Sequence, residues 1–202
     1  GSVKPKPASA ASDGYTGQVM DLTSFDGRAA VIMEYLEGAD LLTVIQWIRE
    51  KNGRMPVQTA LEIIAAVAGA LDAAYNRPPF PGESPLRVIH RDIKPSNIMV
   101  GDFGQTLVLD WGVAKGLGRT EDREKESAHV RTGRSESDED TMVGLITGTP
   151  SYMPPEQAAG KTNLLDERSD VYALGALLYE LLVYRPPFRK KTHLETLRAV
   201  IK

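Results

Sequence analysis

Cysteine is absent from the 202-residue sequence, and histidine occurs only three times. Disulfides, thiolate nucleophiles and cysteine-based zinc sites are therefore excluded, and little remains from which to build another metal site with nitrogen ligands. An excess of one charge is also lacking, because 24 Lys and Arg stand against 27 Asp and Glu, a formal net charge of −3. This balance argues against a nucleic-acid partner. A chain without cysteine fits a reducing compartment, and we expect a cytoplasmic protein.

Long uninterrupted apolar runs are scarce as well, and we expect no membrane-spanning segment in this chain. Hydrophobic residues make up 42% of the sequence and charged residues 25%, as in an ordinary globular domain. Gly1 and Ser2 are typical of the scar that tag removal leaves, and the Pro-, Ala- and Ser-rich run to Ser12 is typical of a flexible leader. We therefore expect one folded domain over residues 13–202.

The apolar pattern predicts an α+β fold with a helical core. Helical spacing of apolar residues predicts four helices, at 40–50, 56–75, 170–184 and 193–201. We expect Asp40 to cap the first helix and the second and third helices to be buried, because apolar residues cover nearly their whole circumference.

Short strands are predicted beside these helices. Two apolar runs around the turn signal Asp26-Gly27 predict a β-hairpin whose second strand, at 29–33, is buried. Three further short strands are expected, at 86–89, 97–100 and 106–109. The segment 116–147 is dense in charge and in Ser, Thr and Gly, has no apolar periodicity, and is expected to be mobile.

Three motifs carry the chemistry of this sequence. The run at 90–97 reads His-Arg-Asp-Ile-Lys-Pro-Ser-Asn, the run at 110–112 reads Asp-Trp-Gly, and the run at 148–156 reads Gly-Thr-Pro-Ser-Tyr-Met-Pro-Pro-Glu. In this order they resemble the catalytic loop, the metal-binding Asp-Phe-Gly and the end of the activation segment of the serine/threonine protein kinase family, in its bacterial Hanks-type branch. The resemblance implies a protein-kinase-like fold, mostly the α-helical C-terminal lobe.

The resemblance also implies ATP and Mg²⁺ as cofactors and a protein as substrate. Asp92 would accept the proton of the attacking hydroxyl, and Lys94, which is typical of the Ser/Thr branch, would neutralise the γ-phosphate. Asn97 and Asp110 would hold magnesium through oxygen atoms. Thr149 would hydrogen-bond near Asp92 and Lys94 and shape the pocket for the acceptor residue.

Neighbouring residues receive structural roles from the same resemblance. Trp111 would pack into the core, and Gly112 would permit the turn of the backbone. Asp170 would accept backbone N–H groups and so anchor His90 and Arg91. The alternative for Asp170 is that it only caps the helix that it opens.

The resemblance further implies a nucleotide-binding hinge. Met33 would be the gatekeeper, and the backbone near Glu34 and Leu36 would bind adenine. Asp40 matches the position that contacts the ribose, and Met99 matches the residue that packs beneath the adenine ring.

Two threonines lie where kinases of this family are switched on by phosphorylation. They are Thr141 and Thr147, with Arg91 as the natural partner of the phosphate. The alternative is that both are ordinary loop hydroxyls. Glu156 is expected to lack the arginine with which the family usually pairs it.

Neither a Gly-rich loop nor a strand lysine occurs ahead of the predicted hinge. We therefore expect a kinase domain truncated at both ends, with 13–34 as the remnant of the small lobe and 35–202 as hinge and large lobe. A Ser/Thr kinase fragment is the leading interpretation. One alternative is a non-catalytic pseudokinase that binds a protein. The other is a chain whose active site is completed or regulated by a protein partner, with the acidic run 136–140 as docking element.

Overall fold

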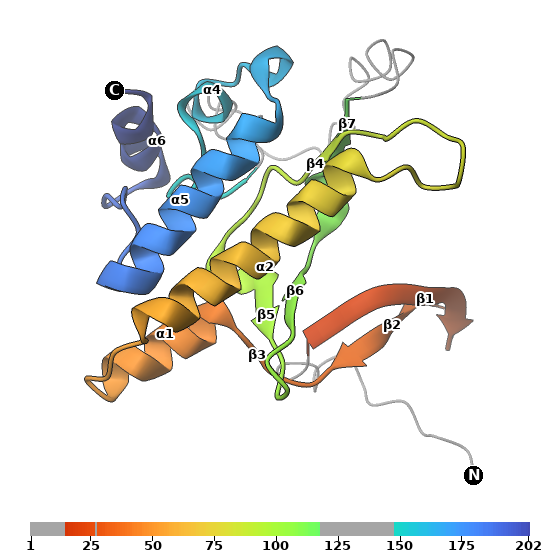
Figure 1. Ribbon diagram of the computed structural model, residues 1–202, viewed down its shortest axis with the longest axis horizontal. Coiled ribbons are helices and arrows are strands. Elements are labelled where there is room, and N and C mark those ends of the chain that lie inside the picture. The colour runs from red at the N-terminus through yellow and green to blue at the C-terminus, as the bar shows by residue number, and fades with distance from the viewer. Residues whose placement is uncertain (1–14, 27, 118–147) are drawn as a thin grey trace.

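The computed structural model describes residues 15–26, 28–117 and 148–202 (Figure 1). A helical layer stands beside two small sheets, and a two-stranded hairpin extends away from them. The α+β class predicted from the sequence is confirmed. The predicted leader, the acidic run 136–140, Thr141 and Thr147 all lie outside the described residues.

The predicted hairpin consists of β1 (Tyr15–Phe25) and β2 (Arg28–Leu36). Phe25 pairs with Arg28, so Asp26 lies in the turn, and its backbone is left-handed at φ 51°. The prediction of a buried second strand is wrong, because Ile32 is 46% exposed. Among the described strands this sheet contains only β1 and β2, and an apolar strand is buried only where another layer covers it.

The first helix, α1 (Leu41–Glu50), begins where the sequence predicted. The Asp40 carboxylate accepts a hydrogen bond from the backbone N–H of Thr43 at 2.6 Å, so the predicted cap is confirmed. Just before it, β3 (Ala39–Asp40) joins the edge of a small sheet.

The second helix, α2 (Val57–Asn76), corrects two predictions. Only one stripe of it is buried, while Leu61 on the other side is 46% exposed. The buried residues are Ala60, Ile63, Val67 and Leu71. By length and composition α2 could also cross a membrane, contrary to the prediction that no segment could. The core helix of a folded domain passes the same test, and α2 packs against another helix, so this feature supports no membrane assignment.

The central helix, α5 (Glu167–Val183), packs along α2 (Figure 1). It begins three residues earlier than predicted, because Asp166 is the cap and its side chain accepts the N–H of Arg168 at 3.0 Å. The first turn, Glu-Arg-Ser, is polar, so a prediction based on the spacing of apolar residues does not include it. The main core includes residues of α1, α2, α5 and β5, among them Leu41, Ile45, Val67, Ile98, Leu177 and Leu181.

Two small antiparallel sheets lie beside the helices. The first is formed by β3, β5 (Ile98–Val100) and β6 (Thr106–Val108), and the second by β4 (Val88–Ile89) and β7 (Lys115–Gly116). The segment predicted to be mobile from residue 116 thus begins with ordered residues. Gly116 pairs with Val88, and Leu117 N–H donates to Arg87 O at 3.1 Å.

A second, smaller core joins α4 (Pro155–Ala158) to α6 (His193–Ile201). Its buried residues are Met153, Ala158, Leu197 and Val200, and Phe188 packs against them. Helix α6 has the predicted limits, and its start is fixed by a capping box between Thr192 and Glu195. Three short 3-10 turns complete the described elements: η2 (Pro95–Asn97), η3 (Trp111–Val113) and η5 (Thr162–Leu164).

Candidate active site

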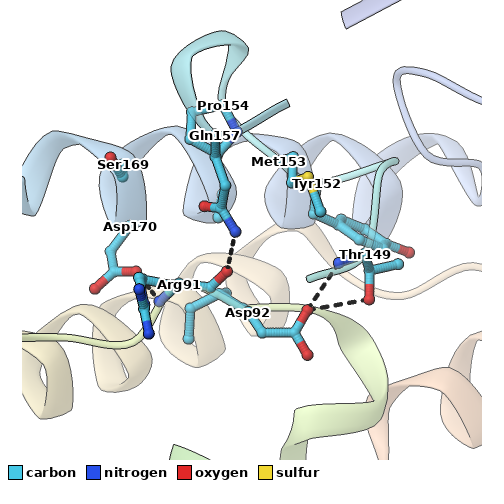
Figure 2. A pocket seen from close by; sticks show the side chains of 11 residues that line it. Arg91, Asp92, Thr149, Tyr152, Met153, Pro154, Gln157, Ser169 and Asp170 are labelled. Carbon is cyan, nitrogen blue, oxygen red and sulfur yellow. Dashed lines mark hydrogen bonds between the residues drawn. The ribbon is translucent and has the colours of Figure 1, made fainter. Parts of the chain in front are cut away.

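Asp92 lies at the centre of a hydrogen-bonded cluster in the loop between β4 and η2 (Figure 2). Its Oδ1 accepts two hydrogen bonds from Thr149, one from the N–H and one from the hydroxyl, both at 3.0 Å. Its Oδ2 lies 2.6 Å from Lys94 Nζ and 3.2 Å from Asn97 Nδ2. The Asp92 side chain is only 9% exposed. Donors from two distant motifs therefore fix the direction of one carboxylate.

Asp170, on the first turn of α5, holds the backbone of the same loop. Its Oδ2 accepts the N–H of His90 at 2.7 Å, and its Oδ1 accepts the N–H of Arg91 at 3.0 Å. Because Asp166 caps the helix, Asp170 does not serve as the cap. Arg91 has a left-handed backbone at φ 69°, a conformation that a residue with a long side chain keeps only when its surroundings impose it.

Asp170 as a residue is only 5% exposed. Burial raises the pKa of Asp170 above its usual value, although the two backbone N–H groups act in the opposite direction. Burying the charged Asp170 carboxylate therefore costs desolvation free energy, and the two hydrogen bonds from the backbone compensate for this cost.

His90 connects this loop to the turn at 110–112. Its Nε2 lies 3.0 Å from Leu109 O, and its Nδ1 accepts the N–H of Asp92 at 3.3 Å. A carbonyl only accepts and an amide N–H only donates, so the geometry assigns the ring proton to Nε2. The fully buried ring also lies 4.7 Å from the ring of Trp111.

The turn at 110–112 differs from the prediction in two respects. The residue with the left-handed backbone is Asp110 (φ 59°, ψ 66°), not Gly112. Aspartate tolerates this conformation because its short side chain bonds locally, and here Oδ1 accepts the N–H of Gly112 at 3.4 Å. Trp111, expected in the core, is 36% exposed; its ring is tilted against that of His90, and its Nε1 donates to Val108 O at 3.1 Å.

Asn97 and Asp110 are brought together by the antiparallel pairing of β5 with β6. Leu109 N–H donates to Asn97 O at 2.8 Å, which places Asp110 one residue from that contact. The Asn97 amide nitrogen donates to Asp92 O at 2.9 Å, so the amide oxygen is the atom available to a cation. A carboxylate and an amide oxygen are hard donors that suit Mg²⁺.

Magnesium is usually held by one or two carboxylates together with substrate phosphates, not by an all-protein cage. Within the described ranges, no three His, Cys, Asp or Glu side chains gather into a site that could hold a metal by themselves. The residues present therefore fit a magnesium ion shared with a phosphate ligand.

The residues predicted to bind the nucleotide are divided between two sheets. Asp40 and Met99 are register partners in β3 and β5, and Met99 is fully buried. Met33, Glu34 and Leu36 lie on β2, in the separate hairpin. Glu34 is exposed and Leu36 is partly buried, and the side chain of Met33 is outside the described part of the structure.

Glu156 has a hydrogen-bond partner, although this partner is not the arginine that the resemblance assigns to it. The Ser169 hydroxyl, on the first turn of α5, donates to Glu156 Oε1 at 2.9 Å.

A buried hydrogen-bonded pair also links Tyr152 to Glu180 on α5, with the phenol hydroxyl donating to Oε2. Burial raises the pKa of Tyr152 and the pKa of Glu180 above their usual values.

Reasoning from the sequence missed Gln157, and it named Gly148 within a motif without giving it a role. Gln157 Nε2 donates to Arg91 O at 2.8 Å, and the residue is 5% exposed. Gly148 has φ 119°, and a Cβ there would lie 2.8 Å from Gln157 Nε2. The only signal in the sequence was a polar residue beside Glu156, which does not reveal a bond to a loop 66 residues away.

Comparison with known proteins agrees with this geometry. The family model for the protein kinase domain matches residues 17–202. "Tyrosine-protein kinase MasK" of Myxococcus xanthus is 35% identical over 185 residues, which cover 92% of this chain and 25% of that protein. "Serine/threonine-protein kinase PknB" of Mycobacterium leprae is 34% identical over 158 residues, covering 78% of this chain and 20% of that protein.

A third relative is "Serine/threonine-protein kinase PknD" of Protochlamydia amoebophila, 30% identical over 168 residues that cover 79% of this chain and 16% of that protein. The chain thus spans a quarter or less of the length of these relatives. A family match that extends over nearly all of its residues shows that the chain belongs to the protein kinase family.

Proposed function

We propose that this chain is part of the catalytic domain of a serine/threonine protein kinase, which transfers the γ-phosphoryl group of ATP to Ser or Thr hydroxyls of a protein. The observation that carries the proposal is the Asp92 carboxylate, bonded by Thr149 on one oxygen and by Lys94 on the other. A carboxylate fixed in this way can orient an attacking hydroxyl and accept its proton. Phosphoryl transfer depends more on such alignment than on a strong base.

The surrounding residues supply the charge that the reaction needs. Lys94 Nζ lies next to Asp92, and its side chain is 24% exposed, so it can neutralise a phosphoryl group placed beside the acceptor hydroxyl. Asn97 and Asp110 are the proposed magnesium ligands. When bound, the ion neutralises charge on the phosphates.

The names of the relatives do not decide the acceptor, because one is named a tyrosine kinase and two are named serine/threonine kinases. Lys94 and Thr149 favour Ser or Thr. Both lie against the Asp92 carboxylate, where they narrow the space for the acceptor, and a short hydroxyl side chain needs less room there than a phenol.

A non-catalytic binding module is the second candidate, and one observation favours it. Neither β1 nor β2 contains a lysine, so these two strands supply no ammonium group to clamp the phosphates of ATP. Under this reading the kinase fold is kept for recognition of a protein partner.

The test is incubation of the purified chain with Mg·ATP and a generic basic protein. Incorporated phosphate is followed by intact mass, and the modified residues are located by fragmentation. We expect phosphoserine or phosphothreonine in the wild type and none with Asp92→Asn, which keeps the shape of the side chain but cannot accept the proton. No phosphate in either protein would favour the binding module, and phosphotyrosine alone would refute the Ser/Thr assignment.

A further inference from the structure

Gln157 reaches from α4 into the loop that carries Asp92 (Figure 2). Its Nε2 donates to the carbonyl oxygen of Arg91 at 2.8 Å, and the residue is 5% exposed. That carbonyl belongs to the peptide unit that joins Arg91 to Asp92. Asp170 holds the other backbone group of Arg91, its N–H, at 3.0 Å. Both polar backbone groups of this residue are therefore bound by buried side chains.

Gly148 lies directly against the same hydrogen bond. A Cβ at this position would lie 2.8 Å from Gln157 Nε2 and 3.2 Å from Arg91 O, and φ is 119°, a region that side-chain-bearing residues rarely adopt. The next residue, Thr149, donates twice to the Asp92 carboxylate. The segment 148–157 thus contacts the catalytic loop at two points, the carboxylate and the peptide unit that precedes it.

We propose that Gln157 is a positioning residue for phosphoryl transfer, which acts through the Arg91 carbonyl to fix the direction of Asp92. Its kinetic consequence rests on the proposed kinase activity. The left-handed backbone of Arg91 is strained, so loss of the donor on its carbonyl allows the peptide unit to rotate, and Asp92 turns with it. A glutamine suits this place because it donates from a long side chain without burying a charge.

The first part of the test compares Gln157→Ala with Gln58→Ala in the full chain. Gln58 lies on the exposed surface of α2, where its Nε2 donates to Glu62 at 2.9 Å, so the control removes the same chemical group far from the site. We expect Gln157→Ala to lower kcat about 5- to 10-fold, the effect of one neutral hydrogen bond, with KM for ATP and acceptor nearly unchanged. Gln58→Ala is expected to leave both constants at the wild-type value.

Gln157→Glu gives a readout that a space-filling role would not produce. A buried glutamic acid has a raised pKa, and in its protonated form it can donate to the Arg91 carbonyl. Once this carboxyl is ionised it can only accept hydrogen bonds, and it then faces a second acceptor, the Arg91 carbonyl oxygen. We therefore expect kcat of this variant, relative to wild type at the same pH, to approach wild type in acid and to fall as the pH rises.

Hydrogen exchange of the catalytic loop tests the proposal without catalysis. We expect peptides covering residues 88–98 to exchange faster in Gln157→Ala than in wild type, while peptides of α2 keep their protection. Unchanged exchange in these peptides, or a kcat ratio for Gln157→Glu that does not vary with pH, would overturn the proposal. If the wild type transfers no phosphate, the proposed activity fails, and the exchange experiment still decides the role of Gln157. Should Gln157→Ala not fold, Gln157→Glu in acid and at neutral pH supplies the comparison.

Discussion

Replacing Asp170 with Asn tests how strongly α5 holds the catalytic loop. Asparagine keeps the shape of the side chain but turns one acceptor oxygen into an NH₂ group, which then faces the N–H of His90 or of Arg91. Losing one hydrogen bond to a charged acceptor costs about 1.5–3 kcal/mol, and a buried N–H left without a partner costs about 1–3 kcal/mol. Because burial raises the pKa of Asp170, removal of its charge offsets part of this sum. We expect the free energy of unfolding to fall by about 3 kcal/mol.

The assay is unfolding in urea, followed by far-ultraviolet circular dichroism and extrapolated linearly to water. Asp166→Asn is the matched control, because it makes the same chemical change four residues earlier in the chain, at the partly exposed cap of α5. Asparagine caps a helix about as well as aspartate, so the control should change stability by less than about 0.5 kcal/mol. A loss below about 1 kcal/mol for Asp170→Asn, or an equal loss in the control, would refute the reasoning.

Three further perturbations follow from the geometry. Tyr152→Phe removes the hydrogen-bond donor that lowers the raised pKa of Glu180, so ionising this buried carboxyl becomes more costly. We expect the free energy of unfolding to fall by about 2 kcal/mol, and by more at about pH 8 than at about pH 5, as melting experiments across pH will measure. Equal losses of stability at both pH values would contradict the expected pH dependence. Thr149→Val removes one of two hydrogen bonds to Asp92 and should lower kcat about tenfold while Thr149→Ser retains most activity, as steady-state kinetics will show. Gly38→Ala places a Cβ against the backbone oxygen of Val100 in β5, at φ 142°. Urea unfolding should reveal a loss of about 3 kcal/mol in the free energy of unfolding, and a loss below about 1 kcal/mol would mean that the backbone shifts freely there.

The sequence predicts best where neighbouring residues decide the structure. The limits of α6 follow from Thr192 and Glu195, which form a capping box within one turn. The cap at Asp40 is equally local. The start of α5 was predicted three residues late, because its first turn is polar and an apolar pattern begins only at Asp170.

Burial and long-range hydrogen bonds are less visible in sequence. The second strand of the hairpin looked buried from its composition, yet Ile32 is half exposed, because burial depends on which layer packs against a strand. The motifs predicted that Asp92, Lys94 and Thr149 belong to one site, and the structure brings them within hydrogen-bonding distance. Gln157 could not be predicted, since its partner is a backbone carbonyl and any residue type provides one.

The hairpin and the helical part divide the residues assigned to ATP. Met33, Glu34 and Leu36 lie on β2, whereas Asn97 and Asp110 lie beside the β5–β6 sheet. Among the described strands this sheet has only two members, and a two-stranded sheet is at best marginally stable alone. A nucleotide that contacts both parts is therefore expected to use some of its binding free energy to restrict the hairpin. A second molecule that restricts the hairpin first would then tighten nucleotide binding without touching the nucleotide, and by thermodynamic reciprocity the nucleotide would tighten the binding of that molecule equally.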